Sequence, residues 1–460
     1  MVTDRIQASD AAYVAGSGKM AKSLKRHSTF IRDLVTYGVG QVALKGLDVV
    51  SFAILVNSLD PAGLGFVGTM IMLGFLITDM FTLGVPRIGV PRYVGDDPDS
   101  SDTIRATGTA FCLIYTAVGA AILLLMPGSF LDRIGLGLST TAFQLYTFSF
   151  VIRALVYMEL EILRMQQKSM AQSILEALPS ALNLLFLVLL LPFARDKLVI
   201  SGLCQLLGWA PLFLWFSFTS LRRYGVKMDR MGEIMRYSVP LVVHRSMSEL
   251  NNMGGRWIVL FTFGLAATGA YTFLSRLGEL LKMALMPIQK AWFPALLRCA
   301  RNGDDRAAGQ MAMIYMACST AAFVGLVLLH RPIAHLIDQE GAYVDYYSAI
   351  IPVAVAGWLT SYYWILGVGF FVAKRSAMII PLTSLSAAIC LVLSYVFARL
   401  GGVTAVPYAS VCGSAVFALS TQYFGRRYFT IHYRPTWIMV WATLIGGSLI
   451  AYLVDHFVAL

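Results

Sequence analysis

Charged side chains lie inside apolar runs of this sequence, where they could bind a charged ligand or carry an ion. Lys45 and Asp48 are three residues apart, and Arg245 and Glu249 are four apart, so each pair shares one face of a helix. An ionised group at the centre of a membrane helix costs roughly 2.5–3.5 kcal/mol and normally faces protein or water. These residues therefore predict a hydrated, net-positive cavity suited to an anionic head group. The candidate substrate-binding residues are Lys45, Asp48, Arg153, Arg245, Glu249, Arg256 and Arg276.

The carboxylates within the apolar runs, which include Asp79 on the second span, have two interpretations. They could hold the cations in place, or they could couple transport to an ion, for which the candidates are Asp48, Asp79 and Glu249. The alternative for the whole set is internal ion pairs between helices, or side chains that reach the membrane surface. Surface reach is the better interpretation for charges nearer the helix ends, namely Glu159, Glu161, Arg164 and Lys282.

The composition indicates that these charged residues belong to the helices of a membrane protein. The 460 residues are 58% hydrophobic and 13% charged, whereas soluble domains carry roughly 25% charged residues. Crossing a bilayer needs about 20 helical residues, because every backbone group must be satisfied within the segment. We expect an all-α polytopic protein with spans near residues 31–57, 64–85, 104–126, 140–164, 169–193, 198–220, 236–262, 266–292, 309–330, 344–372, 375–398, 401–424 and 437–457.

The distribution of Lys and Arg predicts the orientation. With a cytoplasmic N-terminus, the even-numbered spans end at basic connections, of which the longest is residues 221–235. The opposite connections hold few basic residues, such as Arg133 and Arg399. We therefore expect a multi-pass protein of the bacterial inner membrane, and we interpret its net charge of +11 as a topology signal, with no nucleic acid as partner.

Two halves of the sequence look alike. Tyr37 opens the first span and Tyr237 the seventh, and Lys45 and Arg245 each follow eight residues later. Units with an even number of spans give a parallel repeat, so the binding site should lie between the halves. The expected division is a cytoplasmic tail (1–29), a six-helix bundle (30–220), a linker (221–235), a second six-helix bundle (236–425), and a basic loop with an additional C-terminal helix (426–460).

Other chemistry-bearing residues carry weaker signals. Aromatic residues crowd the tenth span, including Trp358 and Tyr362, and they could stack on sugars or form an interfacial belt. Asp97 and Asp99 could form a metal and nucleotide-sugar site, but a solvated turn explains them equally well. No metal-ligand spacing, nucleophile and base pattern or phosphate-binding glycine loop is present in the sequence, so we expect no enzyme activity, metal or cofactor.

Short motifs at the helix ends resemble a known family. Asn57-Ser-Leu-Asp-Pro-Ala-Gly-Leu-Gly65, Tyr237-Ser-Val-Pro240 and Gly269-Ala-Tyr271 followed by Pro287 are similar to the polysaccharide-transport branch of the multidrug/oligosaccharidyl-lipid/polysaccharide exporter superfamily. The resemblance implies a MATE-like fold, in which two six-helix bundles form a V around a central cavity. It also implies outward movement of undecaprenyl-pyrophosphate-linked sugars, with cavity cations gripping the pyrophosphate. We assign that grip to Lys45, Arg153 and Arg245.

The sequence thus favours a flippase for a lipid-linked oligosaccharide that serves exopolysaccharide, capsule or O-antigen assembly. The main alternative is a cation-coupled multidrug antiporter of the same superfamily, whose cavity should be dominated by unpaired carboxylates. A membrane glycosyltransferase, ligase or polymerase would need a sizeable outer loop for its acid and base groups, and the outer connections are short. The expected partners are the lipid-linked substrate, membrane lipid and candidate polymerase and export machinery, and we expect a monomer.

Overall fold

The protein is all α-helical in the parts of the chain that the computed structural model describes, which are residues 45–96, 101–133, 136–166, 168–301, 305–373, 378–425 and 427. The predicted tail 1–29, the Asp97 and Asp99 cluster and the thirteenth span lie outside these residues. The first half comprises a helix over residues 45–58, α2 (Pro61–Phe75), π-helical η1 (Leu76–Met80) and η2 (Val85–Gly89), α3 (Val90–Asp96), α4 (Ser101–Leu125), α5 (Gly128–Arg133), α6 (Thr140–Met165), α7 (Ser169–Leu190), η3 (Leu191–Phe193) and α8 (Lys197–Tyr224).

The second half begins with α9, which runs from Met231 to Arg301 and breaks at Gly264, where φ is 81°. This break separates the predicted seventh and eighth spans. The remaining elements are α10 (Asp305–Ile337), η4 (Val344–Ala349), α11 (Ile350–Ser361), α12 (Tyr363–Leu366), α13 (Val368–Val372), α14 (Ile379–Gly401), η6 (Val403–Ala405) and α15 (Val406–Gly425). The tenth span is therefore not the continuous helix that the sequence predicts, because i to i+3 hydrogen bonds at Tyr362 and Gly367 interrupt it.

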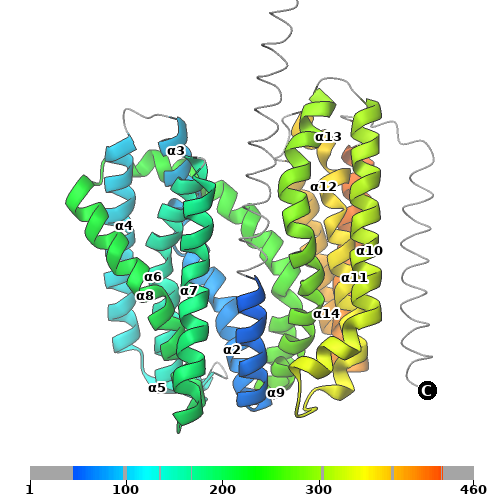
Figure 1. Ribbon diagram of the computed structural model, residues 1–460, viewed down its shortest axis with the longest axis horizontal. Coiled ribbons are helices and arrows are strands. Elements are labelled where there is room, and N and C mark those ends of the chain that lie inside the picture. Colours follow the sequence, from blue (N-terminus) through cyan, green and yellow to red (C-terminus); the bar gives the residue numbers. More distant parts are fainter. Residues whose placement is uncertain are drawn as a thin grey trace, which may run out of the picture.

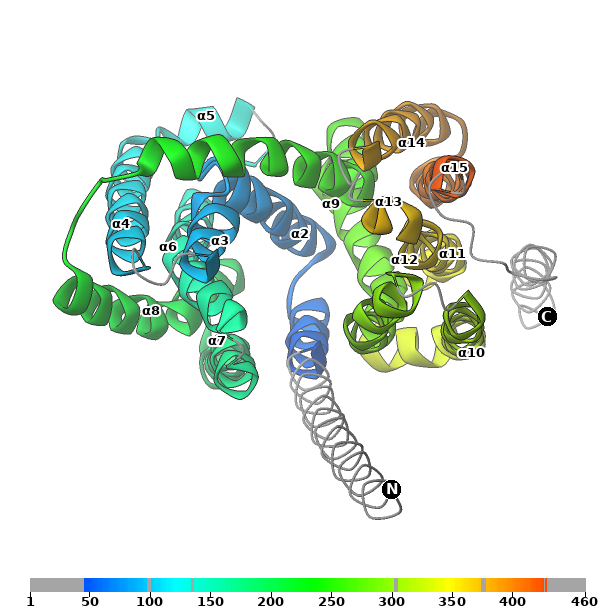
Figure 2. The ribbon, with the colours of Figure 1, turned by 90° about the horizontal axis from the view of Figure 1, so that it is seen from above.

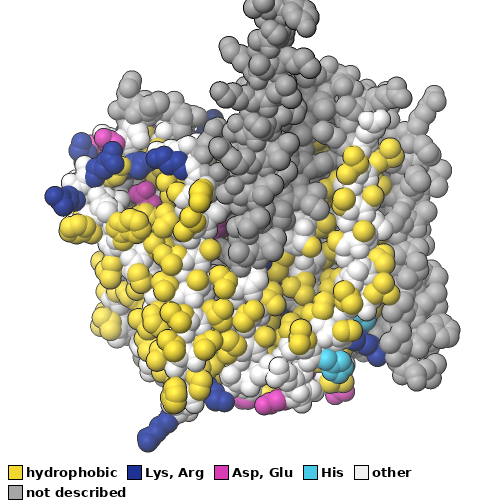
Figure 3. Space-filling view, in the orientation of Figure 1, with side chains coloured by type: hydrophobic (Ala, Val, Ile, Leu, Met, Phe, Trp, Pro, Cys, Tyr) yellow, Lys and Arg dark blue, Asp and Glu magenta, His cyan; other side chains and the backbone are white. Residues whose placement is uncertain are grey.

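The exterior of the molecule is apolar between two polar ends. Within the described residues, eight helical segments are long and apolar enough to cross a membrane. Large hydrophobic side chains such as Leu214, Trp215 and Phe218 on α8 are exposed, and apolar side chains cover the flanks of α7, α8 and α10 (Figure 3). A belt of this kind is what a bilayer requires, and the protein is a multi-pass membrane protein.

Two groups of helices stand side by side, α2 to α8 on one side and α10 to α15 on the other (Figure 1). Seen from above, the first part of α9 runs along one edge from the first group to the second (Figure 2). It packs on the first group at Gly84 and Gly89, where an added Cβ would lie 2.3 Å from Val242 and 2.5 Å from Ile234. The start of α9 therefore straps the two halves together, at the end of the molecule where α8 finishes.

At the opposite end the halves meet through glycines. Asp60 caps α2 by accepting a hydrogen bond of 3.0 Å from the Gly63 amide, and Pro61 occupies the first turn. The next turn presents Gly65, where a Cβ would lie 1.8 Å from the Leu265 carbonyl oxygen; a Cβ on Gly269 would lie 2.0 Å from the Pro61 oxygen. The helix-opening motif thus starts α2 and lets its backbone touch that of α9.

Candidate functional site

A cavity of about 410 Å³ lies between the helix over 45–58, α2, η1, α6, α7, α8 and α9. It lies near mid-depth, because the α6 residues that line it fall between Tyr146 and Tyr157 in a helix that runs from Thr140 to Met165. Five basic and four acidic side chains line it: Lys45, Arg87, Arg153, Arg245, Arg276, Asp48, Asp79, Glu176 and Glu249.

Most of the charged residues singled out in the sequence meet in this one cavity. The structure brings together Lys45, Asp48, Asp79, Arg153, Arg245, Glu249 and Arg276. Arg256 lies outside the cavity and is 3% exposed, because its position late in the first part of α9 carries it past the cavity. Two cavity residues, Arg87 and Glu176, were not among the candidates. Roles for these residues in substrate binding or ion coupling stay predictions.

Asp79 is the centre of an ionic network that joins the halves. Its Oδ2 lies 3.0 Å from Arg87 Nη1 and 3.3 Å from Arg245 Nη2. The Asp79 side chain is only 4% exposed, whereas those of Arg87 and Arg245 are 22% and 34% exposed. The carboxylate is therefore buried beneath two arginines, one from each half, that both line the cavity.

A fold-back of the chain brings Arg87 to Asp79. After η1 the backbone enters the left-handed region at Leu83 (φ 53°) and Gly84 (φ 67°), and η2 then carries Arg87 back toward the cavity. A non-glycine residue in this region is strained, and such strain gathers at functional sites. The sequence pattern placed Arg87 in a basic connection between spans. The signal that could have placed it in the cavity is Gly84-Val85-Pro86, which interrupts an apolar span between Asp79 and Arg87.

Arg153 is held between two aromatic rings, with no carboxylate in ion-pair contact among the described residues. Its guanidinium carbon lies 4.3 Å from the ring centre of Phe150 and 4.5 Å from that of Trp209. The residue is 8% exposed, and its Nε and Nη2 have no hydrogen-bond partner in the described parts of the chain. Cation–π contacts orient a guanidinium without neutralising it. Arg153 is therefore a buried cation with unused donors beside the cavity.

The other cations have acidic neighbours on their own helices. Lys45 Nζ lies 3.3 Å from Asp48 Oδ2, and Ser180 on α7 donates a hydrogen bond of 3.0 Å to the other Asp48 oxygen. Arg276 Nη1 lies 3.6 Å from Glu279 on the next turn of α9. These pairs are what either interpretation expects, carboxylates that hold cavity cations in place or internal ion pairs between helices, so the choice between the two stays a prediction.

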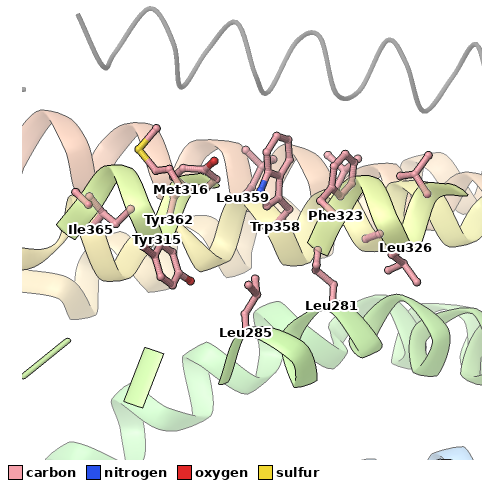
Figure 4. Packing of buried hydrophobic residues seen from close by; sticks show 14 of the residues in the cluster. Leu281, Leu285, Tyr315, Met316, Phe323, Leu326, Trp358, Leu359, Tyr362 and Ile365 are labelled. Atoms are coloured by element: carbon pink, nitrogen blue, oxygen red, sulfur yellow. The ribbon is translucent and has the colours of Figure 1, made fainter. Parts of the chain in front are cut away.

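Aromatic side chains line the cavity, but not those that the sequence pattern suggested. Trp358 of α11 stacks on Phe323 of α10 with ring centres 4.4 Å apart, and Tyr362 is 1% exposed (Figure 4). This crowd belongs to a hydrophobic core. The rings at the cavity come from the first half: Phe52, Phe75, Tyr146, Phe150, Tyr157 and Trp209. No sequence signal separates them from ordinary apolar helix residues.

Comparisons with known proteins agree with this architecture. A family model described as polysaccharide biosynthesis protein matches residues 30–299. Among solved structures, an inward-facing multidrug resistance MATE family transporter of the MOP superfamily aligns with TM-score 0.70 and 15% identity, covering 85% of this chain and 97% of the other. The outward-facing MATE transporter aligns with TM-score 0.63 and 16% identity, covering 86% and 94%.

A third solved structure is a MOP superfamily transporter from Pyrococcus furiosus, described as having a binding pocket of reverse polarity. It aligns with TM-score 0.60 and 14% identity, covering 89% of this chain and 96% of the other. No curated protein sequence matches the chain. At these identities the structural likeness establishes the fold, which is that of MATE transporters.

Proposed function

The chain belongs to the polysaccharide biosynthesis protein family, and we propose that it is a flippase. Its proposed cargo is an undecaprenyl-pyrophosphate-linked oligosaccharide, moved across the bacterial inner membrane by alternating access for exopolysaccharide, capsule or O-antigen assembly. The N-terminus and the basic connections would face the cytoplasm. Family and fold are those of membrane transporters.

Arg153 is the observation that carries this proposal. A buried guanidinium with two nitrogens unpartnered among the described residues is costly, unless the state in which the protein works supplies an anion. Phosphate oxygens match the fork of donors on arginine, and Lys45, Arg87 and Arg245 line the same cavity. Such a site fits the pyrophosphate of a lipid-linked glycan.

The mechanism follows from the closure at one end of the molecule. The glycine contacts of α2 with α9 close the end that would face outward, so a cargo bound from the cytoplasm leaves only after these helices separate. A membrane potential that is negative inside favours outward movement of an anion by roughly 2.3 kcal/mol per charge per 100 mV. Asp48, Asp79 and Glu249 are the proposed groups for ion coupling. Flipping that ignores pH, sodium and membrane potential would contradict that part of the proposal.

A deletion strain tests the cargo. Complementation with the wild-type gene should restore surface glycan, whereas Arg153→Gln should leave lipid-linked oligosaccharide accumulating inside. Arg223→Gln is the matched control, because this exposed arginine lies at the end of α8, away from the cavity. Both variants must reach the membrane in wild-type amounts.

The alternative function is a cation-coupled multidrug antiporter, which the fold alone also permits. Two of the cavity carboxylates, Asp48 and Asp79, are already in ion pairs with cations, which leaves them less suited to cationic drugs. Drug sensitivity of the deletion strain with unchanged surface glycan would favour the antiporter and overturn the flippase.

A further inference from the structure

The contacts of Asp79 with Arg87 and Arg245 are not those that simply holding two arginines in place would require. One oxygen, Oδ2, accepts a hydrogen bond of 3.0 Å from Arg87 Nη1 and forms an ion pair with Arg245 Nη2 at 3.3 Å, while Oδ1 lies 3.3 Å from Arg87 Nη1. Each arginine carries five donors, and Nε of Arg87 has no hydrogen-bond partner within the described chain. A single carboxylate has fewer acceptor sites than two arginines have donors, so Asp79 cannot engage all of them.

Both arginines line the cavity. Arg87 lies over the Tyr157 ring at 4.4 Å and Arg245 near the Phe75 ring at 5.9 Å, and all four residues line the cavity. The partial exposure of both arginine side chains, 22% and 34%, lets a ligand reach them while Asp79 stays buried below. A phosphate has more oxygens and more charge than a carboxylate, so it can bridge both forks at once.

We propose that Asp79 is a built-in competitor for the anionic group of the cargo. In the empty protein its carboxylate occupies Arg87 and Arg245, and a phosphate or pyrophosphate that enters the cavity takes the two arginines from it. This inference rests on the proposed function and names a specificity-determining residue of the same site. It also gives binding a mechanical consequence, because Arg245 belongs to α9 and Asp79 to the first half.

Cargo binding then loosens an ion pair that joins the two halves, beside the place where α9 straps them together. A ligand shifts a conformational equilibrium only by its difference in affinity for the two states. In the state with the Asp79–Arg245 pair intact, the arginines must lose the Asp79 carboxylate before they can hold the anion of the cargo. In the state with the pair broken, they have already lost it. The cargo therefore binds the second state more tightly.

The test compares Asp79→Asn with the wild type in purified, detergent-solubilised full-length protein. Calorimetry measures binding of inorganic pyrophosphate and of farnesyl pyrophosphate, which separates a free anion from a lipid-borne one. Removing the competitor should tighten binding of the preferred probe about tenfold, or 1.4 kcal/mol. Glu233→Gln is the matched control, since it removes an exposed carboxylate paired with Arg230 outside the cavity and should change nothing.

Spin labels provide the second readout. Labels at Arg222 on α8 and Gln310 on α10, both exposed, report any change in the distance between the halves at the end strapped by α9. Asp79→Asn without ligand should give the distance distribution that wild type shows with pyrophosphate. A merely structural role for Asp79 predicts the opposite for binding, because arginines that lose their brace bind the probe more weakly.

The outcomes separate the two proposals. Suppose that the wild type binds a probe through Arg153 but folded Asp79→Asn binds it no more tightly. This result would overturn the proposal that Asp79 competes with the cargo, and the proposed function would stand. If wild type binds neither probe, the proposed function fails and the competitor fails with it. If the affinity rises but the label distances stay as in the empty wild type, the link between binding and movement is wrong.

Discussion

Gly65→Ala should open the end of the molecule that the glycine contacts close. A Cβ at this position would lie 1.8 Å from the Leu265 carbonyl oxygen, whereas ordinary van der Waals contact begins at 3.4 Å. The obstacle is backbone, so side-chain rotation cannot relieve it, and α2 and α9 must separate by about 1.6 Å. Overpacking of this kind costs roughly 1–3 kcal/mol.

That cost applies to the closed arrangement alone, so it should shift the equilibrium toward the open state by about 5- to 150-fold. Spin labels at Phe193 and Leu400, which are 88% and 81% exposed at this end, can measure the shift as a new, longer distance population. Gly325→Ala is the control, because an added Cβ there has nothing within 4 Å. A folded Gly65→Ala protein with the wild-type distance distribution would refute the assignment of this contact as the closure.

Three further predictions follow from other contacts. Asn57 donates a hydrogen bond of 2.6 Å to the Ile337 carbonyl oxygen and accepts one of 2.9 Å from the Gln339 amide. Asn57→Ala should therefore weaken the same closure by about 1–2 kcal/mol. The labels at Phe193 and Leu400 should show a smaller shift than they do for Gly65→Ala. Trp209→Ala removes a ring 4.5 Å from the Arg153 guanidinium and should weaken pyrophosphate binding about tenfold. Trp209→Phe keeps a ring and should weaken binding less. Equal losses of affinity in the two variants would contradict the cation–π role. Trp358→Ala should lower the free energy of unfolding by about 3–5 kcal/mol without changing pyrophosphate binding by the folded protein. Weaker binding by a fully folded variant would mean that the aromatic residues of the tenth span do contribute to the site.

Membrane physics explains why so much of the architecture was predictable from the sequence. A span must be apolar, helical and about 20 residues long, so α4, α7, α8, α14 and α15 lie close to their predicted ranges. The cost of an intramembrane charge likewise singled out Lys45, Asp79, Arg153 and Arg245, which meet in one cavity.

The parts that escaped prediction depend on backbone geometry and packing. Arg87 reaches the cavity only because Leu83 and Gly84 turn the chain back, and the hydropathy profile does not show this turn, which only the Gly84-Val85-Pro86 motif marks. Trp209 and Trp358 have the same side chain on apolar helices, yet one lines the cavity and the other fills a core. Which face of a helix meets the opposite half is a tertiary property, and so is the depth at which the cavity ends, which leaves Arg256 outside.

Reconstitution of the purified protein into liposomes tests whether Arg153 holds the cargo, by following the movement of an undecaprenyl-pyrophosphate-linked oligosaccharide from one leaflet to the other. Wild type and Arg223→Gln should move the lipid at equal rates, and Arg153→Gln should move it at the rate of protein-free liposomes. Undiminished movement by a fully folded Arg153→Gln protein would contradict the claim that this buried cation holds the cargo.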